Sequence, residues 1–353
     1  MSDVADSSLA GVVAASTAIA HVDGKRGVAL VRGYALPELA RRCSYEQAAW
    51  LVLEGELPAP AELASFRAEL EEGARTSALA ATALSGRHGT PEALVAALAL
   101  TGDDAPDGTP SETTARRVLG RVPDACAVAF GRPPPPLHLP YAGRALRALG
   151  AARTDATAER ALEVLLVLET EHGLSASTFA ARVAASAGAS LPAAVAAGAA
   201  TLGGARHGGA TREVQAFLRA AIASGDPGAY ASRQSRIPGF GHRIYKVPDP
   251  RAPPLLEALN TLEATGATPL AVAAKEVERA VVARLGSKGV YANIDFHAAV
   301  LLDALGVAPE AFVGAFALGV ACGWLAHAAE QRAVGKLVRP ESSYTGPPAR
   351  PIP

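Results

Sequence analysis

The chain has 353 residues, of which 50% are hydrophobic and 19% are charged. This composition argues against disorder over most of the chain and suffices for one large domain or two medium ones. With 33 basic and 34 acidic side chains, the net charge is −1, so no overall field draws the protein to nucleic acid or to anionic lipid. An anionic ligand therefore needs a local basic site.

The cysteines and the N-terminus indicate a cellular compartment. Cys43, Cys126 and Cys322 are odd in number and widely spaced, so they match neither a disulfide framework nor a zinc cluster. The N-terminal stretch contains Asp3 and Asp6 and lacks the basic and apolar regions of a signal peptide. We expect a soluble, cytoplasmic protein.

Two uncharged segments, Val183–Ala205 and Ala311–Ala329, are long enough to cross a membrane. The first is mostly Ala, Gly and Ser with Pro192 in its middle, and the second is bounded by Glu310 and Glu330. Neither has the large apolar residues or the basic flank of a membrane span. We interpret both as helices buried in a large helical protein or at a subunit interface.

Helical periodicity runs through nearly the whole chain. Gly27–Val31 is the one segment that resembles a short hairpin strand. Ser44 and Gln47 then form a capping box that opens a helix ended by Gly55. The expected fold class is therefore all-α.

Later helices carry boundary signals of their own. Asp155 precedes the apolar run Ala158–Glu171, which Gly173 ends. Lys275–Arg284 alternates charged residues with valines at helical spacing. These segments support the same all-helical interpretation.

Ser232–Pro254 has no helical pattern, and a loop of about twenty residues inside a compact domain is usually functional. Gly239 and Gly241 allow its backbone to approach a ligand closely. Asp249 is its only acidic residue, whereas its basic residues are Arg233, Arg236, Arg243, Lys246 and Arg251. The loop is a candidate binding site for phosphate or carboxylate groups.

Metal binding and nucleophilic catalysis have little support. His172, His207 and His242 are spaced 35 residues apart, but their surroundings differ, so we infer no repeat. The sequence contains no His-x-x-x-His or Cys-x-x-Cys pair that would favour a metal site. Cys43 and Cys322 lie on apolar helical stretches, where a buried, unreactive thiol is expected.

General acid–base chemistry by neutral histidines and a carboxylate remains. His207 lies in GGARHGG and His242 lies in GFGHR, and a surface loop position is the alternative for each. Asp295 lies in ANIDFH, so it is either a helix N-cap or a carboxylate of raised pKa that removes a proton from carbon. For His172, the alternative to a functional role is a favourable position at a helix C-terminus.

Several separate motifs, in order along the chain, carry a resemblance to a known family. They are GVVAASTAIAHVDGKRGVALVRGYALPELA, EGELP, EHGLSASTFAARV, GGARHGGA, IPGFGHRIYKVPDPRA, KGVYANIDFHAAVLLDALG, GWLAHAAEQ and LVRPESSYTGP. With these motifs the chain resembles the citrate synthase family nearly from end to end. The resemblance is closest to the short bacterial type, which includes the 2-methylcitrate synthases.

The resemblance implies an all-helical homodimer with a shared active site. It places a large domain at residues 1–209 and 307–353 and a small domain, which closes over the site, at residues 210–306. It implies no metal and no cofactor, with an acyl-CoA as co-substrate, and neither nucleic acid nor membrane as a partner.

The implied reaction condenses acetyl- or propionyl-CoA with oxaloacetate or a related 2-oxo acid and then hydrolyses the thioester. By resemblance, Asp295 takes the α-proton of the acyl group, His207 hydrogen-bonds the thioester oxygen of the enol, and His242 polarises the ketone. One such hydrogen-bond donor typically contributes about 2.7–4 kcal/mol. Domain closure keeps water out until the carbon–carbon bond forms.

The resemblance also assigns binding residues. The residues expected to hold the oxo acid are His172, Ser175, Arg251 and Arg339, the last reaching across from the partner subunit. The residues expected at coenzyme A are Gly239, Phe240, Gly241, Lys246 and Lys288. For the two lysines, a solvated surface position is the alternative.

The chain departs from the family pattern around the oxo acid. Val320 stands where the family has an arginine that grips a substrate carboxylate, and loss of such a partner costs about 2–5 kcal/mol. Ser175 and Thr211 each stand where the family has an asparagine, and Ala292 stands where it has a proline. We infer that the condensation chemistry is kept and that the oxo-acid preference is shifted, unless Arg332 or Arg212 supplies the missing cation.

A second hypothesis belongs to a different class of function. The altered oxo-acid site favours a catalytically altered paralogue that binds CoA esters and acts as a regulatory or scaffold dimer. The presence of Asp295, His207 and His242 on separate segments argues for the enzyme, since three catalytic side chains rarely persist together by accident.

Overall fold

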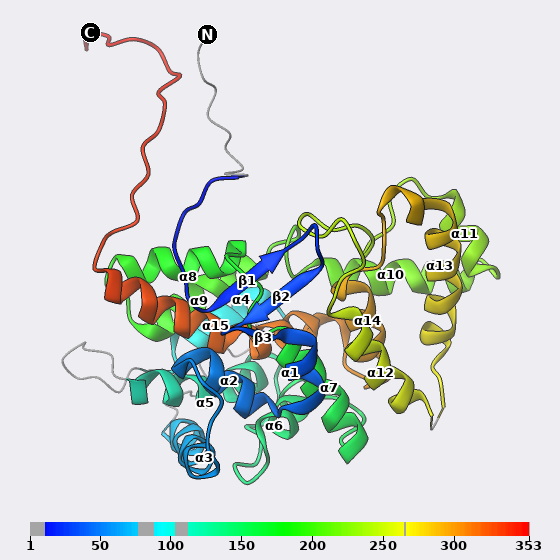
Figure 1. Cartoon of the computed structure of the whole chain (residues 1–353), viewed down its shortest axis with the longest axis horizontal. Coiled ribbons are helices and arrows are strands. Elements are labelled where there is room, and N and C mark those ends of the chain that lie inside the picture. The colour runs from blue at the N-terminus through cyan, green and yellow to red at the C-terminus, as the bar shows by residue number, and fades with distance from the viewer. Residues whose placement is uncertain (1–10, 77–87, 103–111, 265, 353) are drawn as a thin grey trace.

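The structure is a computed structural model that describes residues 11–76, 88–102, 112–264 and 266–352. Within these ranges the chain is a set of packed helices with one small sheet near its N-terminal end (Figure 1). One continuous apolar core, rich in Leu, Val and Ala, joins helices from both halves of the chain. The all-α prediction is confirmed.

Helices form most of the described chain, and several start at a Ser, Thr, Asp or Asn whose side chain accepts a backbone N–H of the first turn. The helices, in chain order, are α1 (Leu36–Arg42), α2 (Tyr45–Glu54), α3 (Pro60–Arg75), α4 (Pro91–Ala99), α5 (Glu112–Ala129), α6 (Tyr141–Ala148), α7 (Ala156–Leu168), α8 (Ala176–Ser186), α9 (Leu191–Leu202), α10 (Ala210–Ala223), α11 (Pro227–Arg233), α12 (Ala252–Glu263), α13 (Pro269–Leu285), α14 (Ile294–Ala304) and α15 (Phe312–Val334).

The predicted helix boundaries at α2 and at the start of α7 are confirmed. Ser44 Oγ accepts the N–H of Gln47, and Gln47 Oε1 accepts the N–H of Ser44 at 2.9 Å. Gly55 ends α2 in the left-handed conformation that glycine adopts without strain. Asp155 Oδ1 accepts two backbone N–H groups of the first turn of α7.

The sheet is larger than expected. The predicted strand Gly27–Val31 is the middle one of three antiparallel strands, β1 (Ala20–Asp23), β2 (Val28–Val31) and β3 (Tyr34–Ala35). The expectation of a single strand was incomplete because β1 and β3 are too short for an alternating pattern to show.

The β1–β2 turn contacts the loop that follows α11. The backbone N–H of Lys246 donates to the carbonyl oxygen of Gly24 at 2.9 Å. Gly24 has no room for a Cβ, because the Ile244 carbonyl packs directly against its Cα. The hairpin therefore fixes the backbone of the loop that carries His242.

α15 lies in the middle of the molecule and packs on α2, α5, α7, α8 and α9. The segment Pro309–Val334 is long and apolar enough to cross a membrane, but its most apolar stretch is entirely buried inside the protein. The interpretation of Ala311–Ala329 as a buried helix is confirmed. The same interpretation is wrong for Val183–Ala205, which is divided between α8 and α9 and contains the exposed Val183. The two helices pack against each other.

Helices α10 to α14 gather at one side of the molecule (Figure 1). α10 packs on α11, α13 and α14, and α11 packs on α13, whereas α12 and α14 also pack on α7. The small domain expected at residues 210–306 contains these helices. Its boundaries remain a prediction.

We predict that Gly198→Ala destabilises the protein. A Cβ at Gly198 would lie 2.7 Å from Cδ2 of Trp324, where α9 meets α15. Better helix propensity would gain about 1 kcal/mol, but overpacking typically costs about 1–3 kcal/mol. The midpoint of urea unfolding should therefore fall.

Ala200→Gly, at an exposed position of the same helix, is the matched control. It should lose about 1 kcal/mol from propensity alone. A Gly198→Ala variant that is as stable as the parent or more so would contradict close packing of α9 on α15.

Candidate active site

One cavity of about 150 Å³ collects residues from distant parts of the chain. It is lined by Glu169, His172, Ser175, Ser177, Thr178, Leu202, His207, Gly208, His242, Arg251, Ile294, Asp295, Phe316 and Val320. Larger hollows of about 320 and 410 Å³ lie beside Glu46 and Arg160 and contain no predicted site residue. The 150 Å³ cavity is therefore the candidate active site.

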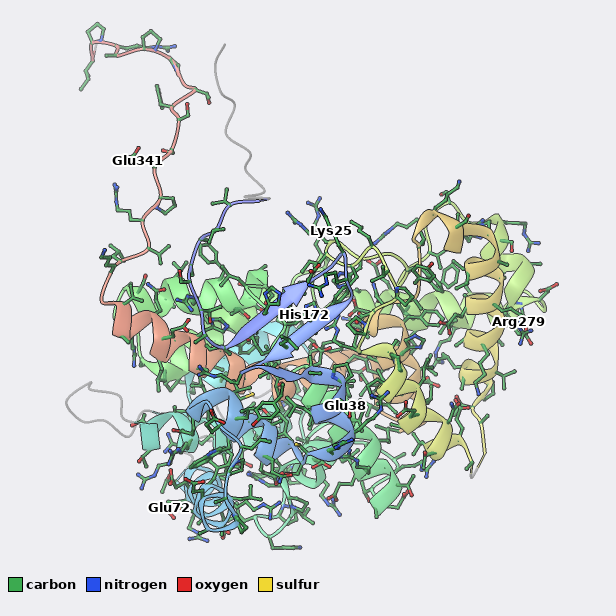
Figure 2. The ribbon with its side chains drawn as sticks, in the orientation of Figure 1. Lys25, Glu38, Glu72, His172, Arg279 and Glu341 are labelled. Atoms are coloured by element: carbon green, nitrogen blue, oxygen red, sulfur yellow. The ribbon has the colours of Figure 1, made fainter. Side chains whose placement is uncertain are left out.

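His172 lies in a turn between α7 and α8. The helix ends at Leu168 with Glu169 as its C-cap, earlier than the predicted end at Glu171 and Gly173. Burial, with a smaller effect of Arg251, holds the pKa of His172 well below its usual value. Because α7 ends at Leu168, His172 lies beyond its last turn, and the helix-terminus interpretation is wrong. Figure 2 labels His172 in the middle of the molecule.

His242 has a defined tautomer. Its Nδ1 lies 3.0 Å from the backbone nitrogens of Ile244 and Tyr245, both of which donate. Nδ1 must therefore be the acceptor, so a neutral ring carries its proton on Nε2. Burial is the main cause that lowers the pKa of His242 to about 4. The ring is thus a neutral hydrogen-bond donor through Nε2.

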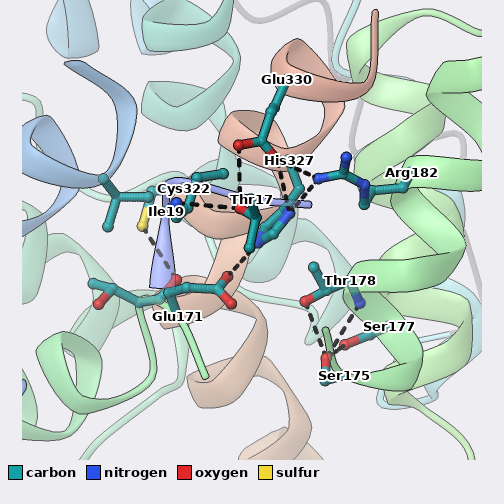
Figure 3. A network of polar contacts seen from close by, with 12 residues as sticks. Thr17, Ile19, Glu171, Ser175, Ser177, Thr178, Arg182, Cys322, His327 and Glu330 are labelled. Carbon is teal, nitrogen blue, oxygen red and sulfur yellow. Dashed lines mark hydrogen bonds and ion pairs between the residues drawn. The ribbon is translucent and has the colours of Figure 1, made fainter. Parts of the chain in front are cut away.

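His207 follows α9 in the glycine-rich turn that leads to α10. Its Nε2 lies 3.0 Å from Oγ of Ser177, and burial lowers its pKa. Ser177 Oγ in turn contacts Ser175 Oγ at 3.1 Å (Figure 3). His207 and His242 both line the cavity, so a mere surface-loop position is wrong for either.

Asp295 is not the N-cap of α14. That role belongs to Asn293, whose Oδ1 accepts the N–H groups of Asp295 at 3.0 Å and Phe296 at 3.4 Å. The Asp295 carboxylate is therefore free to line the cavity. Burial raises its pKa to about 6, although Arg251 acts in the opposite direction. A carboxylate with such a pKa is a suitable general base near neutral pH.

Arg251 is clamped by a buried carboxylate. Its Nε and Nη2 donate to the two oxygens of Asp249 at 3.1 and 2.9 Å. This pairing lowers the pKa of Asp249 to about 2, despite the burial of its carboxyl. Nη1 is directed toward Glu169, whose Oε1 lies 3.5 Å away. Burial raises the pKa of Glu169 to about 8, and Arg251 only partly offsets this.

Neither arginine suggested as a substitute at Val320 lines the cavity. Arg212 is exposed and lines a separate hollow on α10, and Arg332 donates to the carbonyl of Ala189. Arg251 is the one Lys or Arg side chain in the lining formed by the described residues.

The residues expected at coenzyme A lie outside the cavity lining. A Cβ at Gly239 would approach Phe296 and Val214 at 2.8 Å, so this glycine serves packing within the protein. Gly241 has a positive φ of 81° and open space beside it. These contacts assign no ligand to this loop, so the coenzyme A role of Gly239, Phe240 and Gly241 stays a prediction.

The other predicted binding residues have varied surroundings. Lys246 Nζ donates to the carbonyls of His242 and Arg243 at 3.3 and 3.2 Å, and Lys288 is exposed. Arg339 is exposed on the C-terminal segment, which runs away from the helical body (Figure 1). Their roles toward substrate stay predictions.

A buried polar network joins α8, α15 and the turn that carries His172 (Figure 3). Arg182 Nη1 lies 2.8 Å from Nδ1 of His327, and since a guanidinium only donates, Nδ1 accepts. Nε2 of His327 lies 3.3 Å from Oε2 of Glu171. Glu330 Oε1 accepts the N–H of Ala18 at 2.9 Å, which attaches the N-terminal segment to this network.

Sequence reasoning missed Glu169, Ser177, Tyr245 and Asp249. Tyr245 Oη lies 2.8 Å from Nε2 of His172. For Glu169 the sequence contained one indication of a special role, because the helix dipole disfavours a carboxylate at a helix C-terminus. The other three sit in loops or a first helical turn, where polar residues are ordinary.

Comparison with known proteins identifies the family of the chain. The family model described as citrate synthase, C-terminal domain, matches residues 8–341. The chain belongs to the citrate synthase family.

Relatives within the citrate synthase family cover nearly the whole chain. The citrate synthase of Synechocystis sp. is 34% identical over 96% of this chain and 90% of the relative. The 2-methylcitrate synthase of Mycobacterium tuberculosis is 33% identical over 98% of this chain and 91% of the relative.

Solved citrate synthase structures share the fold. The enzyme of Pyrobaculum aerophilum matches with a TM-score of 0.86 at 29% identity, over 98% of this chain and 94% of that chain. The enzyme of Thermoplasma acidophilum, in a ternary complex with carboxymethyl coenzyme A and oxaloacetate, matches with a TM-score of 0.84 at 25% identity, over 97% and 96% of the two chains.

We predict that Asp249→Asn destabilises this citrate synthase family member by about 3–5 kcal/mol, because it leaves a buried guanidinium without its charged partner. Glu257→Gln is the control, since Glu257 also binds an arginine, Arg41, through two hydrogen bonds, but at the surface. It should cost less than about 1 kcal/mol. Equal losses in urea unfolding for the two variants would contradict the proposed importance of burial.

Proposed function

We propose that this protein is an acyltransferase that condenses acetyl- or propionyl-CoA with oxaloacetate or a related 2-oxo acid and then hydrolyses the thioester. The observation that carries the proposal is the meeting of Asp295, His207 and His242 at one cavity. Family membership supports the same reaction. The reaction uses acyl-CoA as a co-substrate and no resident cofactor.

Asp295 removes the α-proton of the acyl group. The α-carbon is a weak acid, so a donor must stabilise the oxygen charge that develops on the thioester. His207 supplies this donor from Nδ1, in the tautomer in which Ser177 Oγ donates to Nε2. The pair thus converts the thioester to its enol without a full negative charge on the thioester oxygen.

His242 activates the second substrate. Its Nε2–H donates to the ketone oxygen of the oxo acid, which makes the ketone carbon more electrophilic. The enol carbon attacks this ketone carbon, and the ketone oxygen takes up a proton as the carbon–carbon bond forms. Water then cleaves the thioester, with hydroxide added to the acyl carbon and the proton to the leaving thiol.

A homodimer with a shared active site is part of the proposal. The C-terminal segment contacts the body through the N–H of Val338, which donates to Ser186 Oγ at 3.1 Å, and the following residues are exposed. An arm of this kind suits a role for Arg339 in the site of a second subunit. A cytoplasmic location is proposed from the free, buried thiols of Cys43, Cys126 and Cys322.

The second candidate function is a non-catalytic dimer that binds CoA esters. The unusual composition of the cavity, with Val320 and Glu169 in its lining, favours it. Calorimetry that detects acyl-CoA binding, together with no thiol release for any 2-oxo acid, would support this function over the enzyme.

We predict that Asp295→Ala lowers acyl-CoA-dependent thiol release by about 10²–10⁴-fold. Asp303→Asn on the same helix is the control, because Asp303 lies outside the cavity and accepts from Gln215. Unchanged turnover in Asp295→Ala would remove the proposed base.

The pH dependence provides a second prediction for the same residue. Asp295 acts as a base only when ionised, so kcat/KM for the acyl-CoA should fall as the pH drops through about 6. His242, with a pKa of about 4, stays neutral through this range. An acidic limb centred near pH 4 instead would contradict the raised pKa of Asp295.

Mixed dimers test the shared site. A dimer of one Asp295→Ala subunit and one Arg339→Ala subunit contains one site with both native residues. Co-refolding the two inactive variants should therefore restore about one quarter of the wild-type sites. No recovery on mixing, with heterodimers present, would contradict the contribution of Arg339 across the interface.

A further inference from the structure

The candidate active site has an excess of carboxyl groups. Arg251 is the one Lys or Arg side chain in the lining formed by the described residues, and Asp249 already binds its Nε and Nη2. Its Nη1 lies 3.5 Å from Oε1 of Glu169, and Asp295 lies close enough to raise the pKa of Glu169 further. One guanidinium therefore faces three carboxyl groups before a substrate enters.

Another part of the lining is apolar. Val320 and Phe316 are four residues apart on α15 and so share a helix face. Leu202 and Ile294 extend this apolar surface. A carboxylate held against these side chains would lose its hydration without gaining an ionic partner. An alkyl group would instead be buried favourably there.

Glu169 has the properties of a hydrogen-bond donor rather than an anion. It is the C-cap of α7, where the helix dipole disfavours negative charge. With a pKa of about 8, its carboxyl is mostly protonated at neutral pH. The charged groups that affect the pKa of Glu169 are Arg251, Asp295 and Asp249. Glu169 in turn affects the pKa of Tyr245.

We propose that Glu169 and Val320 select an electrophile with a single carboxylate, namely a short 2-oxo acid with an apolar side chain. This inference rests on the proposed condensation and names its second substrate. The carboxylate binds Nη1 of Arg251 and the protonated carboxyl of Glu169, and the alkyl group contacts Val320 and Phe316. The ketone oxygen accepts from His242.

A dicarboxylic oxo acid suits this site less well. Its second carboxylate would meet either the apolar wall or the carboxyl groups around Arg251. Arg339 from a second subunit would add one cation, which still leaves fewer cations than carboxyl groups in the loaded site. A monoanion therefore fits the charge of the site better than a dianion.

The proposed reaction is balanced without a further reactant. The α-carbon of the acyl-CoA loses a proton and bonds to the ketone carbon, and the ketone oxygen gains a proton. Water then replaces the thiol at the acyl carbon. The product is a dicarboxylic 2-hydroxy acid that keeps the alkyl group of the oxo acid, and no redox change occurs.

The test compares 2-oxobutanoate and pyruvate with oxaloacetate in a thiol-release assay on the full-length protein, with acetyl- and propionyl-CoA. We expect kcat/KM for 2-oxobutanoate to exceed that for oxaloacetate by at least about tenfold. Val320→Arg should lower the ratio of kcat/KM for 2-oxobutanoate to that for oxaloacetate by about tenfold. Val320→Met, which keeps the wall apolar, should leave it within about threefold.

Glu169→Gln gives a readout that a purely structural role would not change. In the wild type, kcat/KM for the oxo acid should fall as the pH rises through about 8, because ionised Glu169 repels the substrate carboxylate. This alkaline limb should be absent in Glu169→Gln, which cannot ionise.

The outcomes separate the two levels of the proposal. A wild type that prefers oxaloacetate to 2-oxobutanoate and pyruvate would overturn the monocarboxylic substrate but leave the condensation intact. A protein that releases no thiol with any of the oxo acids would overturn both the monocarboxylic substrate and the condensation. An alkaline limb that persists in Glu169→Gln would remove Glu169 from substrate selection.

Discussion

The buried ion pair between Arg251 and Asp249 is the interaction on which the candidate active site depends. Asp249 Oδ2 also accepts the N–H of Ile294 at 3.3 Å, so the same carboxylate holds the start of α14, where Asp295 lies. Arg251 in turn influences the pKa of Glu169, His172 and Asp295. One clamp thus sets both the position of the proposed base and the charge of its surroundings.

Burial then sets the pKa values of the titratable groups in the site. It keeps the imidazoles of His172, His207 and His242 neutral, because desolvation disfavours their charged forms. The same effect moves the pKa of Asp295 up toward neutrality. Neutral donors and a moderately basic carboxylate are what enol chemistry requires, and a single physical cause supplies them all.

The sequence predicted the fold class well, because helical periodicity is a local signal. Its glycine-flanked motifs also singled out His207 and His242, which line the cavity, whereas their catalytic roles stay predictions. It assigned the N-cap of α14 to Asp295 as one alternative, whereas Asn293 fills that position. Such a choice depends on which of two polar neighbours turns toward the helix, and a sequence does not encode this locally.

Long-range contacts explain the remaining differences. The clamp of Arg251 and the contact of Nη1 with Glu169 join α7 to a loop far along the chain. No spacing rule relates these positions. The absence of an arginine in the family motif at Val320 was visible in the sequence, but the acidic side chain beside the remaining arginine became apparent only in three dimensions.

The contact of the β1–β2 turn with the His242 loop has a consequence for folding. Gly24 and Lys246 belong to the first and last thirds of the chain, so their hydrogen bond closes a very long loop. Contacts of such high sequence separation form slowly, because chain entropy must be lost before they are made. We therefore expect the candidate active site to form late in folding, because helix formation alone does not bring Gly24 and Lys246 together.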